Sequence, residues 1–334
     1  MQDWLSALSI KTGNQWVDFN VNALILSAVI ILVPVLIAFI IPLFEKKKGK
    51  LRSTLFLYAF STGFFIVLGL FGEANEGREL AADAASHVDP NNSLLSIGYQ
   101  ILVLVLGSFI GLGAALGFKY FINKKWGKFN LNFPIEEHSD HDAFHNHPHA
   151  HELLFARPNN LDTKSYNKAK TTALYLILFH RFAAGLFLGY TIYNLVASNY
   201  ANTPVTYHAP ESSINLAFLI GFFLHLVPEE AIIYYRQREM GIKKSKSILN
   251  SILMILLLIP FIFLGANLGT FVSELWILNG TIHVIVGVMF MFTALVEFFP
   301  EVIRESTTQK KWYLTILWLI IGVVVCFVLI SFEG

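Results

Sequence analysis

Long hydrophobic stretches separated by polar segments dominate the pattern of this chain of 334 residues. Eight of them reach the roughly 20 apolar residues that a helix needs to cross a hydrocarbon core of about 30 Å. The pattern therefore predicts an all-α integral membrane protein, with eight transmembrane helices in a single domain over residues 1–334. In chain order, spans 1 to 8 cover approximately Val21–Phe44, Ser53–Phe71, Leu94–Phe118, Thr171–Val196, Ile214–Tyr235, Ile248–Val272, Leu275–Phe299 and Trp312–Phe332.

Composition supports this class and excludes others. Hydrophobic residues make up 55% of the chain and charged residues only 14%, whereas about a quarter of the residues of a soluble domain are charged. The formal net charge of +1 provides no basic field, so we expect no nucleic-acid partner. A single cysteine, Cys326, excludes an internal disulfide and a zinc-finger quartet.

Lys and Arg are distributed unevenly between the two sides of the predicted bundle. Of the 24, 21 follow spans 1, 3, 5 and 7, whereas Lys11 and Arg78 fall on the opposite side and Arg181 lies inside span 4. Since loops rich in Lys and Arg stay in the cytoplasm, we expect both termini to be extracytoplasmic. Together with the family resemblance below, this orientation predicts a multi-pass protein of the plasma membrane.

Ionisable residues inside the spans are few. Because a charge in the hydrocarbon region costs about 2.5–3.5 kcal/mol on insertion scales, such residues are candidates for function. Span 4 carries His180 and Arg181, and span 5 carries His225, Glu229 and Glu230. His225 and Glu229 are four residues apart, so a helix places them on one face, within reach of a common ion.

Histidine nitrogen and carboxylate oxygen are ligands that suit Zn²⁺ and related transition metals. We therefore predict a metal site formed by His180, His225 and Glu229, with Arg181, Glu230 and Glu297 as accessory residues. Pro228 lies inside the motif, and it is expected to loosen the helix near Leu224. In the alternative interpretation these residues form a buried ionic network, in which Arg181 pairs with Glu229 or Glu230. Both interpretations can hold together.

The motifs of spans 4 and 5 resemble those of the ZIP (Zrt/Irt-like) metal-ion transporters. Here they read H-R-F-A-A-G over residues 180–185 and H-L-V-P-E-E over residues 225–230. The resemblance implies a ZIP-like helix bundle with eight spans and both termini outside the cytoplasm. It also implies metal ligands on spans 4 and 5 and a His-rich cytoplasmic loop between spans 3 and 4. Glutamates near the ends of spans 2 and 7, in LFGEA and EFFPE, extend it.

The chain also departs from the family pattern. Family members with two adjacent metal sites use an Asn in span 4, an acid directly after the span 5 His, and an acid in span 6. Arg181 and Leu226 occupy the first two positions here, and span 6 has no acid. The sequence therefore predicts a divergent member with a single metal site, in which the Arg181 guanidinium occupies the space of the second ion.

A histidine-rich segment lies between spans 3 and 4, within a predicted cytoplasmic loop over residues 122–170. Residues 136–152 have too little apolar content to build a core, so we expect disorder there and loose binding of divalent metal. A solvated linker without function is the alternative. The segment holds His138, His141, His145, His147, His149 and His151.

Two further features have mainly structural interpretations. An acidic segment after span 2 is expected to be an outward loop, either solvated or attracting cations; it contains Glu73, Glu76, Glu79, Asp83, His87 and Asp89. Glycines four apart are expected to form helix-packing faces. They occur as Gly107-x-x-x-Gly111 and Gly113-x-x-x-Gly117 in span 3 and as Gly185-x-x-x-Gly189 in span 4.

These features favour a carrier, and not an enzyme, that moves a divalent metal cation into the cytoplasm between spans 4 and 5. Zn²⁺ is the first candidate substrate, other divalent transition metals are alternatives, and we expect no organic cofactor. The expected partners are the lipid bilayer and the metal ion, with a homodimer as an option. Two other functions stay open. One is an intramembrane zinc hydrolase with Glu230 or Glu297 as general base, and the other is a metal sensor that no longer transports.

Overall fold

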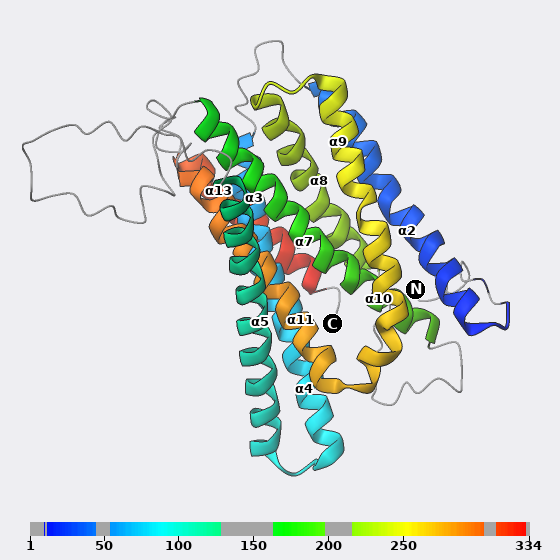
Figure 1. Ribbon diagram of the computed structural model, residues 1–334. Coiled ribbons are helices and arrows are strands. Elements are labelled where there is room, and N and C mark those ends of the chain that lie inside the picture. The colour runs from blue at the N-terminus through cyan, green and yellow to red at the C-terminus, as the bar shows by residue number, and fades with distance from the viewer. Residues whose placement is uncertain are drawn as a thin grey trace, which may run out of the picture.

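The computed structural model describes residues 10, 12–44, 54–127, 163–197, 216–303 and 312–331. Within these ranges the chain is helical and has no β-strand (Figure 1). Most elements are α-helices, η1 is a 3₁₀-helix, and η2 and η4 are π-helices. The elements are α2 (Gln15–Ile40), η1 (Ile41–Phe44), α3 (Thr54–Val67), η2 (Leu68–Glu73), α4 (Ala74–Val88), α5 (Ser93–Gly127), α7 (Thr163–Ala197), α8 (Leu216–Glu239), α9 (Lys244–Leu256), α10 (Leu258–Glu274), α11 (Trp276–Phe292), η4 (Thr293–Phe298) and α13 (Trp312–Ile330).

The helices coincide with the hydrophobic stretches of the sequence. Six helical segments of the described chain are long and apolar enough to cross a membrane, and α7 contributes a shorter apolar segment, Ile177–Tyr193. These helices indicate a membrane-embedded protein. The six segments are Trp16–Leu43, Leu55–Val88, Ser93–Ile122, Lys244–Gly269, Ile277–Ile303 and Trp312–Ile330.

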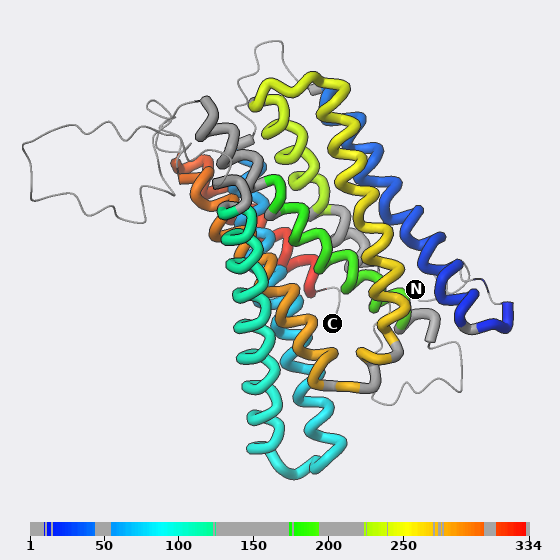
Figure 2. Tube along the Cα trace, viewed as in Figure 1, coloured from blue at the N-terminus to red at the C-terminus, as the bar shows by residue number. Residues whose placement is uncertain are grey.

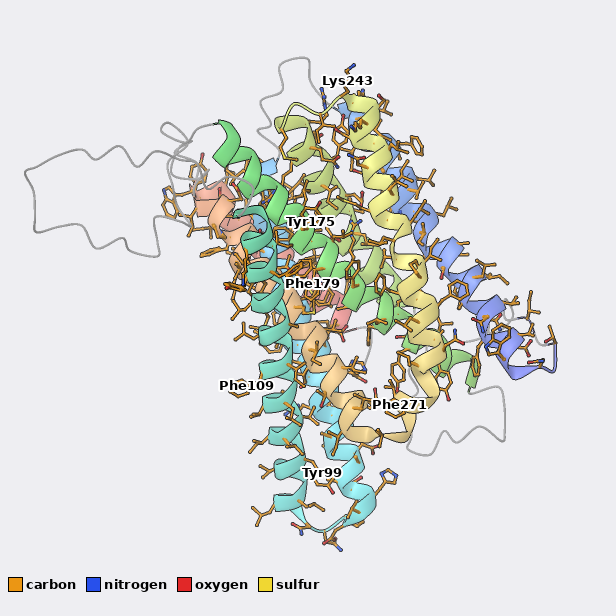
Figure 3. The ribbon with its side chains drawn as sticks, viewed as in Figure 1. Tyr99, Phe109, Tyr175, Phe179, Lys243 and Phe271 are labelled. Atoms are coloured by element: carbon orange, nitrogen blue, oxygen red, sulfur yellow. The ribbon has the colours of Figure 1, made fainter. Side chains whose placement is uncertain are left out.

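Successive membrane-crossing segments run in opposite directions through the bundle, whereas α3, η2 and α4 continue in one direction, as do α9 and α10 (Figure 2). The α8–α9 turn lies at one end, and the α4–α5 and α10–α11 connections lie at the other; we call these the α8–α9 end and the α4–α5 end. Lys243 marks the first of them in Figure 3. Nearby, Lys244 Nζ donates to the carbonyl oxygen of Pro42 at 2.9 Å, which joins α9 to η1. Phe109 of α5 projects away from the other helices and is 75% exposed, as expected of a side chain that faces lipid.

Helices α7 and α8 lie in the middle of the bundle. One apolar cluster joins them to α2, α9 and α10, and a second joins them to α3, α11 and α13. Because α7 and α8 contribute side chains to both clusters, polar residues in the middle of these helices, such as Arg181 and Glu229, are enclosed by protein. Representative members of the first cluster are Ile30, Leu188, Leu226, Ile255 and Ile262, and of the second Phe65, Ile177, Ile232, Phe290 and Cys326.

The acidic segment after span 2 is a helix, so the expectation of a loop was wrong. Residues 74–88 form α4, which packs against α5 and α11. Its buried residues are small and lie at positions i, i+4, i+7 and i+8, namely Gly77, Ala81, Ala84 and Ala85. This spacing is that of one helix face, and Ala is the best helix former. The periodicity was readable in the sequence, but the acidic residues obscured it.

Prolines affect two helices differently. Helix α8 continues through Pro228 from Leu216 to Glu239, so the motif of span 5 stays helical. Span 6 is divided instead, because α9 ends at Leu256 and α10 begins at Leu258. Pro260 lies four residues after Leu256, and a proline ring clashes with the carbonyl four residues before it. This clash accounts for the break, which the sequence analysis did not predict.

Glycines allow close helix crossings at several places. Helix α11 meets η2 and α4 at two pairs, Gly69 with Gly287 and Gly77 with Gly280. A Cβ atom on Gly69 would lie 2.5 Å from the Gly287 carbonyl oxygen, and one on Gly77 would lie 2.5 Å from that of Gly280. Only glycine permits such backbone contact.

The predicted glycine faces are confirmed in two cases out of three. The Gly107-x-x-x-Gly111 motif packs against α11, and the motif that ends at Gly189 packs against the backbone of α10. The remaining motif behaves differently, because a Cβ atom added to Gly113 or Gly117 would meet no atom of another described helix within 4 Å.

Candidate functional site

A buried cluster of charges lies where α7 meets α8. Arg181 of α7 is 1% exposed, and Glu229 and Glu230 of α8 are 1% and 0% exposed. Arg181 Nε donates to Glu229 Oε1 at 3.1 Å, and Arg181 Nη2 forms an ion pair with Glu230 Oε1. One guanidinium therefore binds both carboxylates. We call these three residues the Arg181 triad.

The local sequence explains how one arginine reaches two adjacent glutamates. Neighbouring residues of a helix point about 100° apart, so Glu229 and Glu230 approach α7 from different directions. The guanidinium group is planar and carries five N–H donors in a fixed fork. It can thus use Nε for one carboxylate and Nη2 for the other. The sequence predicts either Glu229 or Glu230 as the partner of Arg181, and the structure pairs it with both.

The triad is not saturated with hydrogen bonds. Among the described residues, no partner contacts Oε2 of Glu229, Oε2 of Glu230 or Nη1 of Arg181, although all three atoms are buried. Buried polar atoms in proteins nearly always have a partner. Two carboxylates face one guanidinium, so the formal charges also leave one negative charge uncompensated within the triad. The site can therefore accept one more cationic or hydrogen-bonding group.

His180 lies next to the triad in the chain and is equally buried, at 1% exposure. Its ring packs against those of Phe290 and Phe65, with centroid distances of 4.5 and 5.6 Å. These aromatic neighbours come from α11 and α3. The imidazole is thus surrounded by aromatic side chains and lies on α7, the helix that also carries Arg181.

Part of the predicted ligand set lies outside the described residues. The backbone of His225 belongs to α8, four residues before Glu229, but its side chain lies outside the description. The segment with the six predicted loop ligands lies wholly outside the described residues. These ligands are His138, His141, His145, His147, His149 and His151. Within the described residues, no group of three or more His, Cys, Asp and Glu side chains could hold a metal ion.

Glu297, a predicted accessory residue, lies apart from the triad in η4. Its Oε1 accepts a hydrogen bond from Lys119 Nζ of α5 at 3.4 Å. Four residues after Glu297, Glu301 pairs with Arg236 of α8 at 3.7 Å. Arg236 Nε also donates to Tyr58 Oη at 2.6 Å. We call these five residues the second ionic network. The residue pairs of this network join four separate segments, so they are not predictable from the sequence pattern.

A third buried pair lies towards the α4–α5 end. His283 Nδ1 of α11 lies 3.1 Å from Glu73 Oε2, the last residue of η2, and each residue is 8% exposed. The His283 ring also meets the Phe187 ring edge to face at 4.8 Å. The sequence pattern draws attention to Glu73 but does not connect it to His283. Their occurrence inside two apolar helices was the available signal.

Compared with models of known protein families and with curated protein sequences, the chain shows no match to either. The resemblance to the ZIP family thus rests on the motifs described above. The structure adds the geometry around Arg181, one of the positions at which the chain departs from that family's pattern.

Proposed function

We propose that the protein is a carrier that moves a divalent metal cation, with Zn²⁺ as the first candidate, into the cytoplasm between α7 and α8. The observation that carries the proposal is the Arg181 triad, which places two carboxylates and one guanidinium in the centre of a membrane bundle. An uncompensated buried carboxylate is costly, so a site of this kind attracts cations. The triad lies on the two central helices α7 and α8, between which a transported ion would cross the membrane.

The proposed ligands are His180, His225 and Glu229, as in the motifs that resemble the ZIP family. Glu229 Oε2 supports this assignment, because it is buried and has no partner among the described residues. The nitrogen and oxygen donors suit Zn²⁺ and its neighbours among the transition metals. In this proposal Glu230 keeps Arg181 in place while Glu229 binds the ion.

The proposed membrane arrangement is that of eight spans with both termini outside the cytoplasm, in the plasma membrane. The asymmetry of Lys and Arg along the chain supports it, since basic loops stay in the cytoplasm. The α8–α9 end, where Lys243 and Lys244 lie, then faces the cytoplasm. In a carrier, alternating access would open the central site first to one side and then to the other.

A non-transporting metal sensor or structural subunit is the second candidate. It is favoured by the pairing of Arg181 with both glutamates, because this network can hold α7 and α8 together without any ion. The two candidate functions differ in whether the protein transports metal ions across the membrane.

Radiozinc uptake into proteoliposomes tests the proposal. The wild type should show saturable uptake, and the double variant His180→Ala, His225→Ala should lose it at matched amounts of folded protein. His87→Ala is the matched control, because its exposed side chain lies on α4, far along the chain from both motifs, and uptake should be unchanged. A wild type that transports none of zinc, manganese, iron and cadmium would overturn the carrier function and favour the sensor.

A further inference from the structure

Glu229 in its ionised form requires a positive partner in every state of the protein. Its carboxylate is 1% exposed, and an ionised carboxylate without a partner carries a large desolvation penalty in the protein interior. In the structure the partner is Arg181, through the 3.1 Å contact of Nε with Oε1. When a transported cation binds Glu229, this role passes to the cation.

The geometry of Arg181 allows it to release one carboxylate and keep the other. It contacts Glu229 through Nε and Glu230 through Nη2, so the two interactions use different nitrogens. Glu230 is completely buried and lies beside Glu229 in the chain. A guanidinium that moves away from Glu229 can therefore remain paired with Glu230, and its charge never loses a partner.

On the basis of the transport function proposed above, we propose that Arg181 is a tethered counter-ion, which replaces the transported cation at Glu229 whenever the site is empty. With the cation bound, Glu229 holds the ion and Arg181 holds Glu230. With the cation released, Arg181 holds both glutamates through its Nε and Nη2 atoms.

This arrangement has a consequence for the transport cycle. A carrier that performs net uptake must return its empty site across the membrane, whereas a carrier that exchanges one ion for another returns loaded. The guanidinium neutralises Glu229 only in the empty state. Loss of Arg181 should therefore slow net uptake selectively and leave ion exchange intact.

Two flux measurements with radiozinc test this inference. Net uptake is measured into proteoliposomes without internal zinc, and exchange is measured into proteoliposomes that are preloaded with unlabelled zinc. In the wild type the two rates should agree within about twofold, because the return of the neutralised empty site limits neither. This comparison requires no substitution, so it does not depend on the folding of a variant.

The diagnostic variant is Arg181→Gln combined with Glu230→Gln. It removes one charge of each sign and thus keeps the net formal charge of the triad, while Glu229 loses its tethered cation. Net uptake should fall by about tenfold or more, because the penalty of an unpaired buried carboxylate exceeds the free energy of one decade in rate. Exchange should stay within about twofold of the wild type. Tyr313→Phe, on an exposed side chain of α13, is the control and should change neither rate.

Several results would overturn the inference. One is wild-type exchange that exceeds net uptake by about tenfold, which would show that the empty site returns slowly despite Arg181. Another is a folded double variant in which net uptake and exchange fall together, or in which neither falls. Absence of both fluxes in the wild type would be a different failure, because it would overturn the carrier function itself and this inference with it.

Discussion

Glu73 and His283 are 210 positions apart in the chain, yet Glu73 Oε2 lies 3.1 Å from His283 Nδ1. The pair joins η2 to α11 in a buried environment. It lies beside the crossing of Gly69 and Gly287, where the two backbones touch. Side-chain and backbone contacts thus fasten the same two segments.

We expect the two residues to stabilise the fold jointly. In a double-mutant cycle with Glu73→Met and His283→Phe, the coupling free energy should be about 1–3 kcal/mol, because hydrogen bonds to charged groups contribute more than neutral ones. It is measured as the free energy of unfolding in detergent. The exposed pair Arg78 and Glu79, at 3.9 Å, is the control and should couple by less than about 0.5 kcal/mol. Equal coupling of the two pairs would contradict the prediction.

The Arg181 triad should be sensitive to partial removal and tolerant of complete removal. Arg181→Ala leaves two buried carboxylates without their cation and should lower the free energy of unfolding by about 3–5 kcal/mol. Replacing Arg181, Glu229 and Glu230 together by Met removes all three charges and should leave the protein folded.

Thermal unfolding of both variants in detergent checks this difference, and radiozinc uptake adds a second measurement. The triple variant should be folded and inactive in transport. A triple variant that unfolds more readily than Arg181→Ala would show that the network is required for folding.

Glycine contacts give a matched comparison within the same protein. Gly189→Ala should destabilise the bundle by about 1–3 kcal/mol, because the new methyl group would meet the α10 backbone and overpacking forces backbone shifts. Gly113→Ala has no neighbouring atom within 4 Å among the described residues, and it should be neutral or slightly stabilising, since Ala favours helix. The order of the two melting temperatures is the readout, and a reversed order would refute the packing argument.

Tyr58→Phe tests the second ionic network. The substitution removes the hydroxyl that accepts the 2.6 Å hydrogen bond from Arg236 but keeps the ring, over which the guanidinium lies at 5.2 Å. We expect a loss of about 1.5–3 kcal/mol, the contribution of a hydrogen bond to a charged group. Tyr313→Phe on the exposed face of α13 should cost nothing measurable, and chemical denaturation of the two variants side by side provides the comparison.

Much of the fold was predictable, because hydrophobicity and helix formation coincide in a membrane. The stretches chosen by hydropathy are helical where the structure describes them, apart from the break at Leu257 and the terminal positions Leu275 and Ser331. Helix α4 was missed because its acidic side chains suggested a solvated loop. Its buried small residues carried the correct signal.

The candidate site was predictable only in its membership. Burial and the pairing of Arg181 with Glu229 and Glu230 agree with the network interpretation, but the involvement of both glutamates depends on how α7 and α8 meet in space. The metal ligand set remains a prediction, since the side chain of His225 lies outside the described residues.

The π-helices explain why some helix-face arguments fail. His283 and Glu297 are fourteen residues apart, and a straight α-helix would place them near one face. Helix η4 begins at Thr293, between them, and a π-helical turn accommodates an extra residue, which rotates everything after it. His283 accordingly meets Glu73, whereas Glu297 meets Lys119. A local change of helix type is not visible in hydropathy.

The paired glycines between α11 and the segment of η2 and α4 have a mechanical consequence. Where backbone touches backbone, no side chain is available to change rotamer and absorb a sliding motion. We therefore expect these segments to behave as one stiff unit during any conformational change. Hydrogen exchange should then show the two helices opening together, with equal protection on both sides of their crossing.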